Sequence, residues 1–467
     1  MDFSNSEAPK YIPERRYRYI RDVLKKCPGL IITVDDESAM KLAHFSVKEY
    51  LLSEKIKEGS WGRFAIDEQL AHSLISRTCL VHLLEAGKAP FQDPLDRYAA
   101  EHWVFHAKSA TSASNNTPDL SRLIVDFFRS GNTVAHWCKL HDIDEETYWW
   151  IDCSRNTPTP MPIYLAALVG FEVAVTQLVG DRVDVNAIGG RLSTALVVAS
   201  AKGHTNIVKV LVDGGANVNA WGGFYGNALQ AASYGGHKAI VKLLVDRDAG
   251  VNAEGGEYGY ALQAASYGGH EAIVKLLVDG GANVNAYGGF YGYALQAASY
   301  GGHEAIVKLL VDGRAKVNAQ GGKYGNALQA ASYHGHEAVV KLLVDQGASV
   351  DAQGGKYGYA LIAASYCGHE AVVKLLIERG ADVKVVTMDY GNALKTASDR
   401  GHKAIVKLLN EGCADVNAQG GKYGNALQTA SYSGHEAILK EGQQDVVDLL
   451  RENGAQTFEN ENDKNNA

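Results

Sequence analysis

Histidine is the first residue type in this sequence whose spacing could do chemistry, because imidazoles bind metals and transfer protons. Gly-His pairs recur at a constant step of 33 residues. The histidines of these pairs are His204, His237, His270, His303, His336, His369, His402 and His435. His270 and Glu271 begin an H-E-x-x-H zinc motif, but Val274 stands where its second histidine is needed. Successive histidines lie one repeat apart, too far to share a metal ion, so a structural role is predicted for them.

Two smaller groups in the first third of the chain could also hold a metal. His102 and His106 lie four residues apart on a predicted helix, beside Glu101. The apolar residues 103–105 between them favour a helix packed into a core instead. His136, Cys138 and His141 form a looser group without an apparent fourth ligand.

The usual motifs of nucleophilic catalysis and of nucleotide binding are also missing from the sequence. Ser46 lies in H-F-S-V, which is not the G-x-S-x-G elbow of a hydrolase. No G-x-x-x-x-G-K-[ST] loop is present, so a phosphate cradle and its Mg²⁺ hydroxyl are missing. We therefore predict no catalytic, cofactor-binding or metal-binding residue, and expect that the chain is not an enzyme.

Composition limits the remaining classes of function. The 467 residues carry 45 Lys+Arg against 53 Asp+Glu, a formal net charge of −8, and 46% are hydrophobic. A folded protein is expected, with neither nucleic acid nor a membrane as its partner, because both would need a concentrated basic surface. The six cysteines form no C-x-x-C pair, and the first thirty residues lack an apolar signal region. These features favour a reducing, cytoplasmic location.

The 33-residue period organises most of the chain. Nine copies are predicted across residues 157–456, the first of them weaker and the last interrupted. In the copy at 222–254, Asn227 is a good N-cap for a short helix at 228–234, and Gly236 can adopt the left-handed turn that ends it. A second helix at 238–246 carries one apolar face, and a Gly-Gly turn follows. Such a helix–turn–helix–hairpin unit must stack on its neighbours to bury that face.

This run, G-N-A-L-Q-A-A-S-Y-G-G-H-x-A-I-V-K-L-L-V-D, resembles the ankyrin repeat. The resemblance covers about two-thirds of the chain and implies an all-α solenoid that binds proteins. Some copies depart from the pattern. Tyr260, Tyr293 and Tyr359 replace the Asn cap, at a cost of up to ~1 kcal/mol each. Thr387 and Met388 replace Gly-Gly in one copy, which leaves the geometry of that hairpin open.

The first third of the chain does not repeat. Strands are predicted near residues 30–34 and 40–42, and helices at 17–26, 44–54, 64–84, 95–108 and 120–129. Residues 34–52 resemble the end of the winged helix that follows the NACHT ATPase domain in fungal immune-receptor-like proteins, and residues 79–84 and 98–103 resemble their helical connector. The predicted organisation is a winged-helix remnant at 1–60, a helical connector at 61–156, the repeat array at 157–456 and a disordered tail at 457–467.

The NACHT resemblance implies that this chain is the sensing or partner-binding arm of such a receptor, or a stand-alone paralogue, acting in fungal self/non-self or innate recognition. The ATPase that would drive such a switch is absent from the sequence. A free-standing ankyrin scaffold or adaptor is the alternative, and a hydrolase with its site in residues 61–156 is a more distant one.

Aromatic residues at repeating positions are the predicted partner-binding residues. Tyrosines recur near the end of the first helix, where ankyrin-like stacking faces them into a concave groove, and varied residues occupy the hairpins. Tyr and Trp dominate binding hot spots because they give large contact areas with few rotatable bonds. The predicted set is Trp221, Phe224, Tyr234, Glu254, Glu257, Tyr267, Tyr287, Phe290, Tyr300, Lys323, Tyr333, Lys356, Tyr366, Lys422 and Tyr432. Another tyrosine column, at residues 225, 258, 291, 324, 357, 390 and 423, is expected to pack inside the hairpins instead. A protein partner is expected in the groove and at the hairpin tips.

Overall fold

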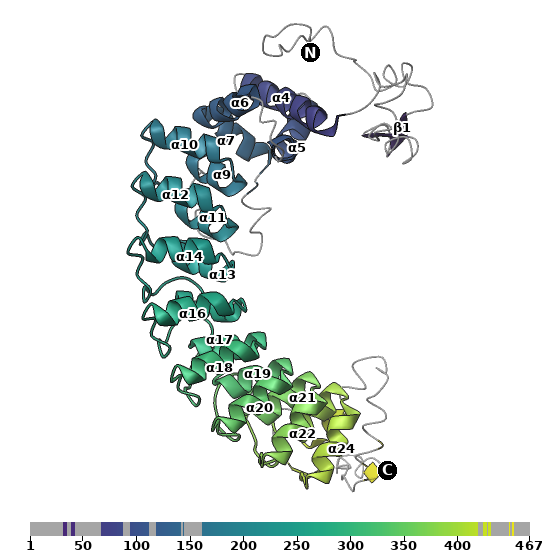
Figure 1. Ribbon diagram of the computed structural model, residues 1–467. Coiled ribbons are helices and arrows are strands. Elements are labelled where there is room, and N and C mark those ends of the chain that lie inside the picture. The colour runs from purple at the N-terminus through teal and green to yellow at the C-terminus, as the bar shows by residue number, and fades with distance from the viewer. Residues whose placement is uncertain are drawn as a thin grey trace, which may run out of the picture. The chain divides into compact units, whose positions relative to one another are not determined.

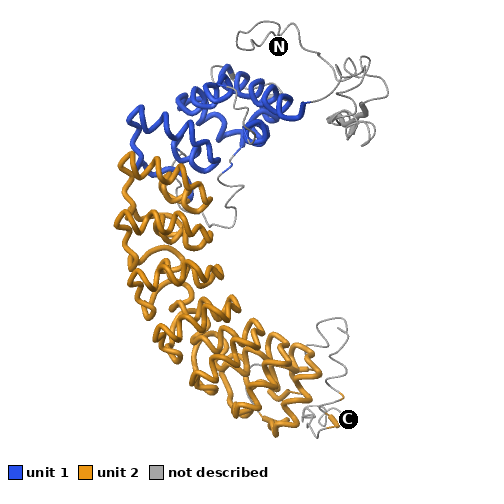
Figure 2. The backbone as a smooth tube through the Cα atoms, viewed as in Figure 1, with its two compact units in different colours: residues 1–191 blue, residues 192–467 orange. Residues whose placement is uncertain are grey.

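The computed structural model describes residues 31–34, 39–42, 67–86, 94–111, 118–141, 143, 161–418, 424–426, 428–430, 448, 451 and 452. The predicted helices at 17–26 and 44–54, the tail at 457–467, and the two predicted site residues Lys422 and Tyr432 lie outside these residues. The chain divides into two compact units, residues 1–191 and 192–467 (Figure 2). No helix of the described residues is long and apolar enough to cross a bilayer.

The first unit begins with a short antiparallel hairpin of β1 (Ile31–Val34) and β2 (Ala39–Leu42), in which Ile31 pairs with Leu42. The two predicted strands are therefore confirmed. Three predicted helices follow as α4 (Glu68–Ala86), α5 (Pro94–Thr111) and α6 (Pro118–Arg129). The sequence analysis missed α7 (Gly131–Leu140), which contains His136 and Cys138; Ser130 caps it by accepting a hydrogen bond from the Thr133 amide.

The core of this unit is aromatic. The Trp103 side chain is fully buried, with ring centroids 4.8 Å from Phe127, 5.5 Å from Trp137 and 5.4 Å from Phe171. Trp103 and Val104 thus lie in the core as predicted. Phe105 does not; 62% of its surface is exposed, because it lies on the opposite face of the same helix.

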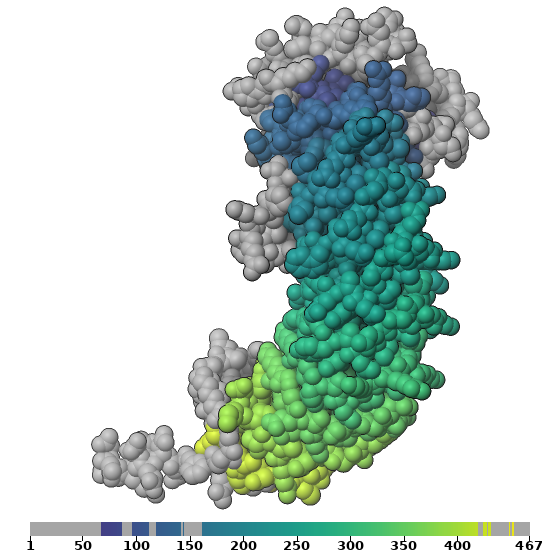
Figure 3. Space-filling view, turned by 90° about the vertical axis from the view of Figure 1, so that its left-hand side faces the viewer, coloured from purple at the N-terminus to yellow at the C-terminus, as the bar shows by residue number. Residues whose placement is uncertain are grey.

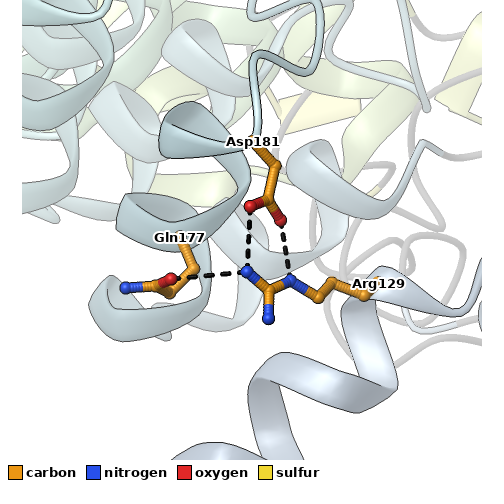
Figure 4. A network of polar contacts seen from close by, with 3 residues as sticks. All are labelled: Arg129, Gln177 and Asp181. Carbon is orange, nitrogen blue, oxygen red and sulfur yellow. Dashed lines mark hydrogen bonds and ion pairs between the residues drawn. The ribbon is translucent and has the colours of Figure 1, made fainter.

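The first repeat packs against these helices. It consists of α9 (Pro162–Val169) and α10 (Glu172–Gly180), and Phe171 between them stacks on Trp103. At the surface, the Arg129 guanidinium donates hydrogen bonds to both carboxylate oxygens of Asp181 at 2.7 and 2.9 Å, and one to Gln177 at 3.4 Å (Figure 4). This exposed ion pair joins α6 to the end of α10, but it is screened by solvent, so the aromatic core is the main attachment.

The second unit contains seven helix pairs within its described residues. The first helices are α11 (Ala195–Lys202), α13 (Ala228–Tyr234), α15 (Ala261–Tyr267), α17 (Ala294–Gly301), α19 (Ala327–His334), α21 (Ala360–Cys367) and α23 (Ala393–Arg400). The second helices are α12 (Thr205–Asp213), α14 (Lys238–Val245), α16 (Glu271–Asp279), α18 (Glu304–Asp312), α20 (Glu337–Asp345), α22 (Glu370–Glu378) and α24 (Lys403–Glu411). Within this unit the first helices line the inner side of a curve and the second helices its outer side (Figure 1). From the outer side, the colours of successive repeats follow one another without a break (Figure 3).

The local signals act as the sequence predicts. The Asn227 side chain accepts a hydrogen bond from the Gln230 amide at 2.9 Å, and Gly236 has a φ of 76°. Ile240, Val241 and Leu244 of α14 are fully buried, and burying each such side chain contributes roughly 1.5–3 kcal/mol. The alanines of α13 are also fully buried, and they let neighbouring helices approach closely.

Polar side chains tie each repeat to the next. Asn219 is typical, because its side-chain oxygen accepts from the Gly250 amide at 2.8 Å and its NH₂ donates to the Asp248 carbonyl at 3.2 Å. Buried Gln230 donates to the carbonyls of Ala253 and Gly259 in the following hairpin. These bonds fix the positions of the hairpins against the helices.

Candidate protein-interaction surface

The repeating histidines are structural, as predicted. In six copies Nε2 donates to a carbonyl of the preceding repeat; His270, for example, bonds the Tyr234 oxygen at 2.8 Å. The ring also fills the space above a glycine, and a Cβ added to Gly236 would meet the His270 ring. His237, His303, His336, His369 and His402 make the same bond, at 2.9–3.3 Å.

Two columns of tyrosines interlock along the array, and we call them the tyrosine ladder. The helix column consists of Tyr234, Tyr267, Tyr300, Tyr333 and Tyr366, and the hairpin column of Tyr225, Tyr258, Tyr291, Tyr324 and Tyr357. Each helix tyrosine lies between two hairpin tyrosines; Tyr234 is 5.3 Å from Tyr225 and 5.0 Å from Tyr258 between ring centroids. Two pairs of adjacent helix tyrosines also meet: Tyr234 and Tyr267 are 6.2 Å apart and nearly parallel, and Tyr267 and Tyr300 are 5.8 Å apart and tilted.

Burial separates the two columns. The five hairpin tyrosines of the ladder are only 3–7% exposed, which confirms that they pack inside the hairpins. Tyr390 of the predicted column is only half-buried, and Tyr423 lies outside the described residues. The helix tyrosines are half-buried and keep part of each ring at the surface. Burial, followed by contacts with neighbouring tyrosines, raises the pKa of the phenols of Tyr225, Tyr258 and Tyr291. The phenols of these three hairpin tyrosines therefore stay uncharged at neutral pH.

The hairpin tips form a second continuous feature, because their backbones are hydrogen-bonded from repeat to repeat. The amide of Glu257 donates to the Phe224 carbonyl at 2.9 Å, and the amide of Phe290 donates to the Glu257 carbonyl at 2.8 Å. Lys323 and Lys356 continue this series, with both bonds at 3.1 Å. Equivalent side chains of neighbouring hairpins therefore lie side by side, as across the strands of a sheet.

We call the two resulting lines of side chains the tip rows. One row is Trp221, Glu254, Tyr287, Gln320 and Gln353, and the other is Phe224, Glu257, Phe290, Lys323 and Lys356. Trp221 is 71% exposed and Tyr287 is 58% exposed; the two glutamates and two lysines are also exposed, whereas Phe224 and Phe290 are half-buried. Every predicted tip residue within the described part of the chain thus lies at the surface.

The glycines of the tips have a role that a turn alone does not explain. A Cβ on Gly255 would overlap the Trp221 indole, and one on Gly321 would overlap the Tyr287 ring. Each large side chain lies across the first glycine of the next hairpin. In these two hairpins the first glycine is therefore required by packing against the preceding repeat.

A model of ankyrin repeats matches residues 163–255, 219–288, 262–354, 294–387 and 360–461, which together make up more than half of the sequence. The chain belongs to the ankyrin-repeat family. The predicted all-α ankyrin solenoid, preceded by helices, is confirmed.

Proteins similar to this ankyrin-repeat chain include one fungal and one human protein. The azaphilone pigments biosynthesis cluster protein L of Monascus ruber is 33% identical over 229 residues, which are 44% of this chain and 48% of that protein. This chain thus spans about half the length of that curated relative. The human ASB11 ankyrin repeat domain is 26% identical, with a TM-score of 0.41, and the match covers 48% of this chain and 96% of that one. Neither similarity concerns a NACHT-type receptor.

The ankyrin copy that lacks Gly-Gly still closes its hairpin. The Thr387 amide donates to the Gly391 carbonyl at 2.8 Å, and the Gly391 amide donates back to Thr387 at 3.1 Å. Met388 at this tip is 95% exposed. The open question about this hairpin is therefore answered, and Met388 is an exposed apolar residue that the predicted site omitted.

Residues of this copy and of both its neighbours line a cavity that the sequence analysis also missed. Its volume is about 280 Å³, and its lining residues are Tyr366, Asp389, Tyr390, Lys395, Thr396, Asp399, Arg400 and Thr429. The Arg400 guanidinium lies 4.0 Å from the centroid of the Tyr366 ring. An alignment of the repeat copies could have indicated this cavity, because Lys395 aligns with Gln230 and Asp399 aligns with Tyr234.

The N-terminal helices bring together two pairs of polar side chains, His72 with His106 and His82 with Asp96. His106 Nδ1 lies 2.7 Å from His72 Nδ1, and in the described part of the chain no three His, Cys, Asp or Glu side chains could hold a metal. A buried His82–Asp96 pair lies on α4 and α5, where burial raises the pKa of the nearby Cys79 thiol to about 12. That thiol stays protonated at neutral pH and is a poor nucleophile.

Burial of His334 in the array is expected to make the stability of the folded chain depend on pH. His334 packs at the end of α19 against Tyr300, Tyr333 and His336, and burial, followed by His336 and His369, lowers its pKa to about 4. Because an unfolded histidine titrates near pH 6.5, the unfolded chain binds more protons between about pH 6.5 and 4, and the free energy of unfolding falls as the pH falls through this window. We expect the melting temperature of His334→Gln to fall less than that of the wild type when the pH is lowered from about 7 to about 4.5. An equal loss in both proteins would contradict the prediction.

Proposed function

We propose that this chain is a non-enzymatic protein-recognition module that binds its partner with the tip rows and the half-buried faces of the tyrosine ladder. Ankyrin repeats generally act as protein-interaction modules. The observation that carries the proposal is the exposure of Trp221 and Tyr287 on hairpins joined by hydrogen bonds. Aromatic side chains fixed in this way bind with a small loss of conformational entropy.

The finer role rests on the N-terminal third. Its resemblance to the segment after a NACHT ATPase supports a sensing or partner-binding arm of such a receptor, or a stand-alone paralogue. In that role, binding at the array would bias the conformational equilibrium of an ATPase partner.

A free-standing scaffold or adaptor is the second candidate. The Monascus ruber relative is named for a pigment biosynthesis cluster, and a scaffold that organises other proteins of such a cluster would need no ATPase. Capturing the partner and identifying it distinguishes the receptor role from the scaffold role. A NACHT-type ATPase is expected for the receptor role and a biosynthetic protein for the scaffold role.

The proposed interaction is tested by removing the aromatic side chains of the tips. The variant Trp221→Ala/Phe224→Ala/Tyr287→Ala/Phe290→Ala should capture its partner from a cell extract at least about 100-fold more weakly, because each hot-spot residue contributes about 2 kcal/mol or more. The melting temperature should fall by less than about 4 °C, because the helix core is untouched.

The matched control changes four exposed lysines of the second helices, Lys242, Lys275, Lys308 and Lys341, to alanine. These side chains belong to neither the tip rows nor the tyrosine ladder, so capture should be unchanged. Retained capture by the aromatic variant, at an unchanged melting temperature, would overturn the proposed binding surface.

A further inference from the structure

Six side chains from three consecutive hairpins form the most distinctive part of the tip rows, and we call them the tip patch. Trp221 and Phe224 stand at one end, Glu254 and Glu257 in the middle, and Tyr287 and Phe290 at the other end. The backbone bonds from Glu257 to Phe224 and from Phe290 to Glu257 hold the three hairpins in register. Two carboxylates therefore lie between two pairs of aromatic rings.

The carboxylates of the tip patch are not neutralised by the chain itself. Within the described residues neither Glu254 nor Glu257 forms an ion pair, and both are exposed. The Glu254 carboxylate has a hydroxyl neighbour, since burial and then Glu254 raise the pKa of the Tyr260 phenol. A hydroxyl leaves the negative charge in place, so the middle of the patch attracts a cation.

The aromatic rings have the same preference. An aromatic face attracts an ammonium or guanidinium group through its quadrupole, and tryptophan does so best. The structure contains an example in the same row, where Lys323 Nζ lies 4.8 Å from the centroid of the Phe290 ring. Carboxylates and ring faces thus favour one kind of ligand group and disfavour anions.

We propose that the tip patch recognises a basic side chain of the partner, arginine or lysine, flanked by apolar residues. The apolar flanks pack on the exposed rings of Trp221 and Tyr287, and the cation lies over Glu254 and Glu257. The partner residue that follows toward Lys323 and Lys356 is acidic or neutral, because those two exposed ammonium groups repel a second cation. This inference rests on the proposed function, since it names the chemistry of the partner at the same surface.

The test uses the full chain labelled with 5-fluorotryptophan, in which the Trp221 resonance is assigned with Trp221→Phe. The probes are acetylated and amidated pentapeptides of sequence Gly-Leu-X-Leu-Gly, where X is arginine, lysine, citrulline or glutamate. Citrulline has the shape of arginine without its charge. We expect the arginine and lysine peptides to shift the Trp221 signal with about tenfold higher affinity than the citrulline peptide, and the glutamate peptide to bind more weakly still. The ratio of arginine to lysine affinity distinguishes a guanidinium from an ammonium ligand.

Two double variants, each of which neutralises two charged side chains, complete the design. Glu254→Gln/Glu257→Gln should remove the preference for arginine over citrulline. Lys242→Gln/Lys275→Gln, on the exposed side of the second helices and outside the tip rows, should keep it. Equal binding of the arginine and citrulline peptides, or no Trp221 shift at about 10 mM peptide, would overturn the inference. If Glu254→Gln/Glu257→Gln still captures the natural partner fully while the aromatic variant does not, the proposed binding surface is supported and the proposed basic side chain is contradicted.

Discussion

Replacing Gly256 with alanine is expected to lower the free energy of unfolding of the array by about 3 kcal/mol or more. Gly256 has a φ of 63°, a region that costs an alanine roughly 1–2 kcal/mol. In addition, its new Cβ would overlap the carbonyl group of Tyr225 in the preceding repeat. Backbone cannot move aside as a flexible side chain can, so the hairpins must separate. The bond from the Glu257 amide to Phe224 would then be lost, and the tip patch with it.

The matched control is Gly281→Ala. Gly281 has a similar positive φ of 87°, but a Cβ there would meet nothing within 4 Å. Gly281→Ala should therefore lower the free energy of unfolding only by the conformational cost of a positive φ, about 1 kcal/mol. Urea denaturation measures both changes, and hydrogen exchange of the Glu257 and Phe290 amides should accelerate in Gly256→Ala only. Equal destabilisation by the two substitutions would show that the close stacking of the hairpins is not required.

Replacing Trp103 with alanine is the second change with a large expected effect, a loss of about 3–5 kcal/mol in the unit that contains the N-terminal helices. Its indole is fully buried and touches rings from α6, α7 and the start of the first repeat, so truncation leaves a cavity that several helices line. Loss of the Phe171 stacking should also loosen α10 from α6, because the remaining surface ion pair is weak.

Phe105→Ala on the same helix is the control. Its ring is 62% exposed, so the substitution should cost less than about 1 kcal/mol. Thermal unfolding followed by near-UV circular dichroism reports on the aromatic core, and limited proteolysis reports on the attachment of α10. An unchanged transition in Trp103→Ala would contradict the role of this core in holding the first repeat.

Local signals in the sequence determined the repeating unit. The 33-residue step, the Asn227 cap, the left-handed Gly236 and the apolar face of residues 238–245 act over a few residues, so the helices and turns followed from the chain alone. The exposed positions at the tips were also predicted, because they vary while the framework beside them does not. The helix α7 was missed, although Val134 and Trp137 are spaced to share one buried face. Trp137 also donates a hydrogen bond to the Ala100 carbonyl of α5.

The sequence by itself therefore determined that this protein is an array of ankyrin repeats with aromatic hairpin tips. Only the tertiary structure decided how residues 33 positions apart meet. It brought Glu254 and Glu257 between four aromatic rings, joined the two tyrosine columns into one ladder, and made Gly255 and Gly256 obligatory through the neighbouring repeat. The physical reason is that caps, turns and apolar periodicity are fixed by interactions within one repeat. The contacts of the tips and the ladder depend instead on how closely adjacent repeats stack, which is set by the packing of all their helices.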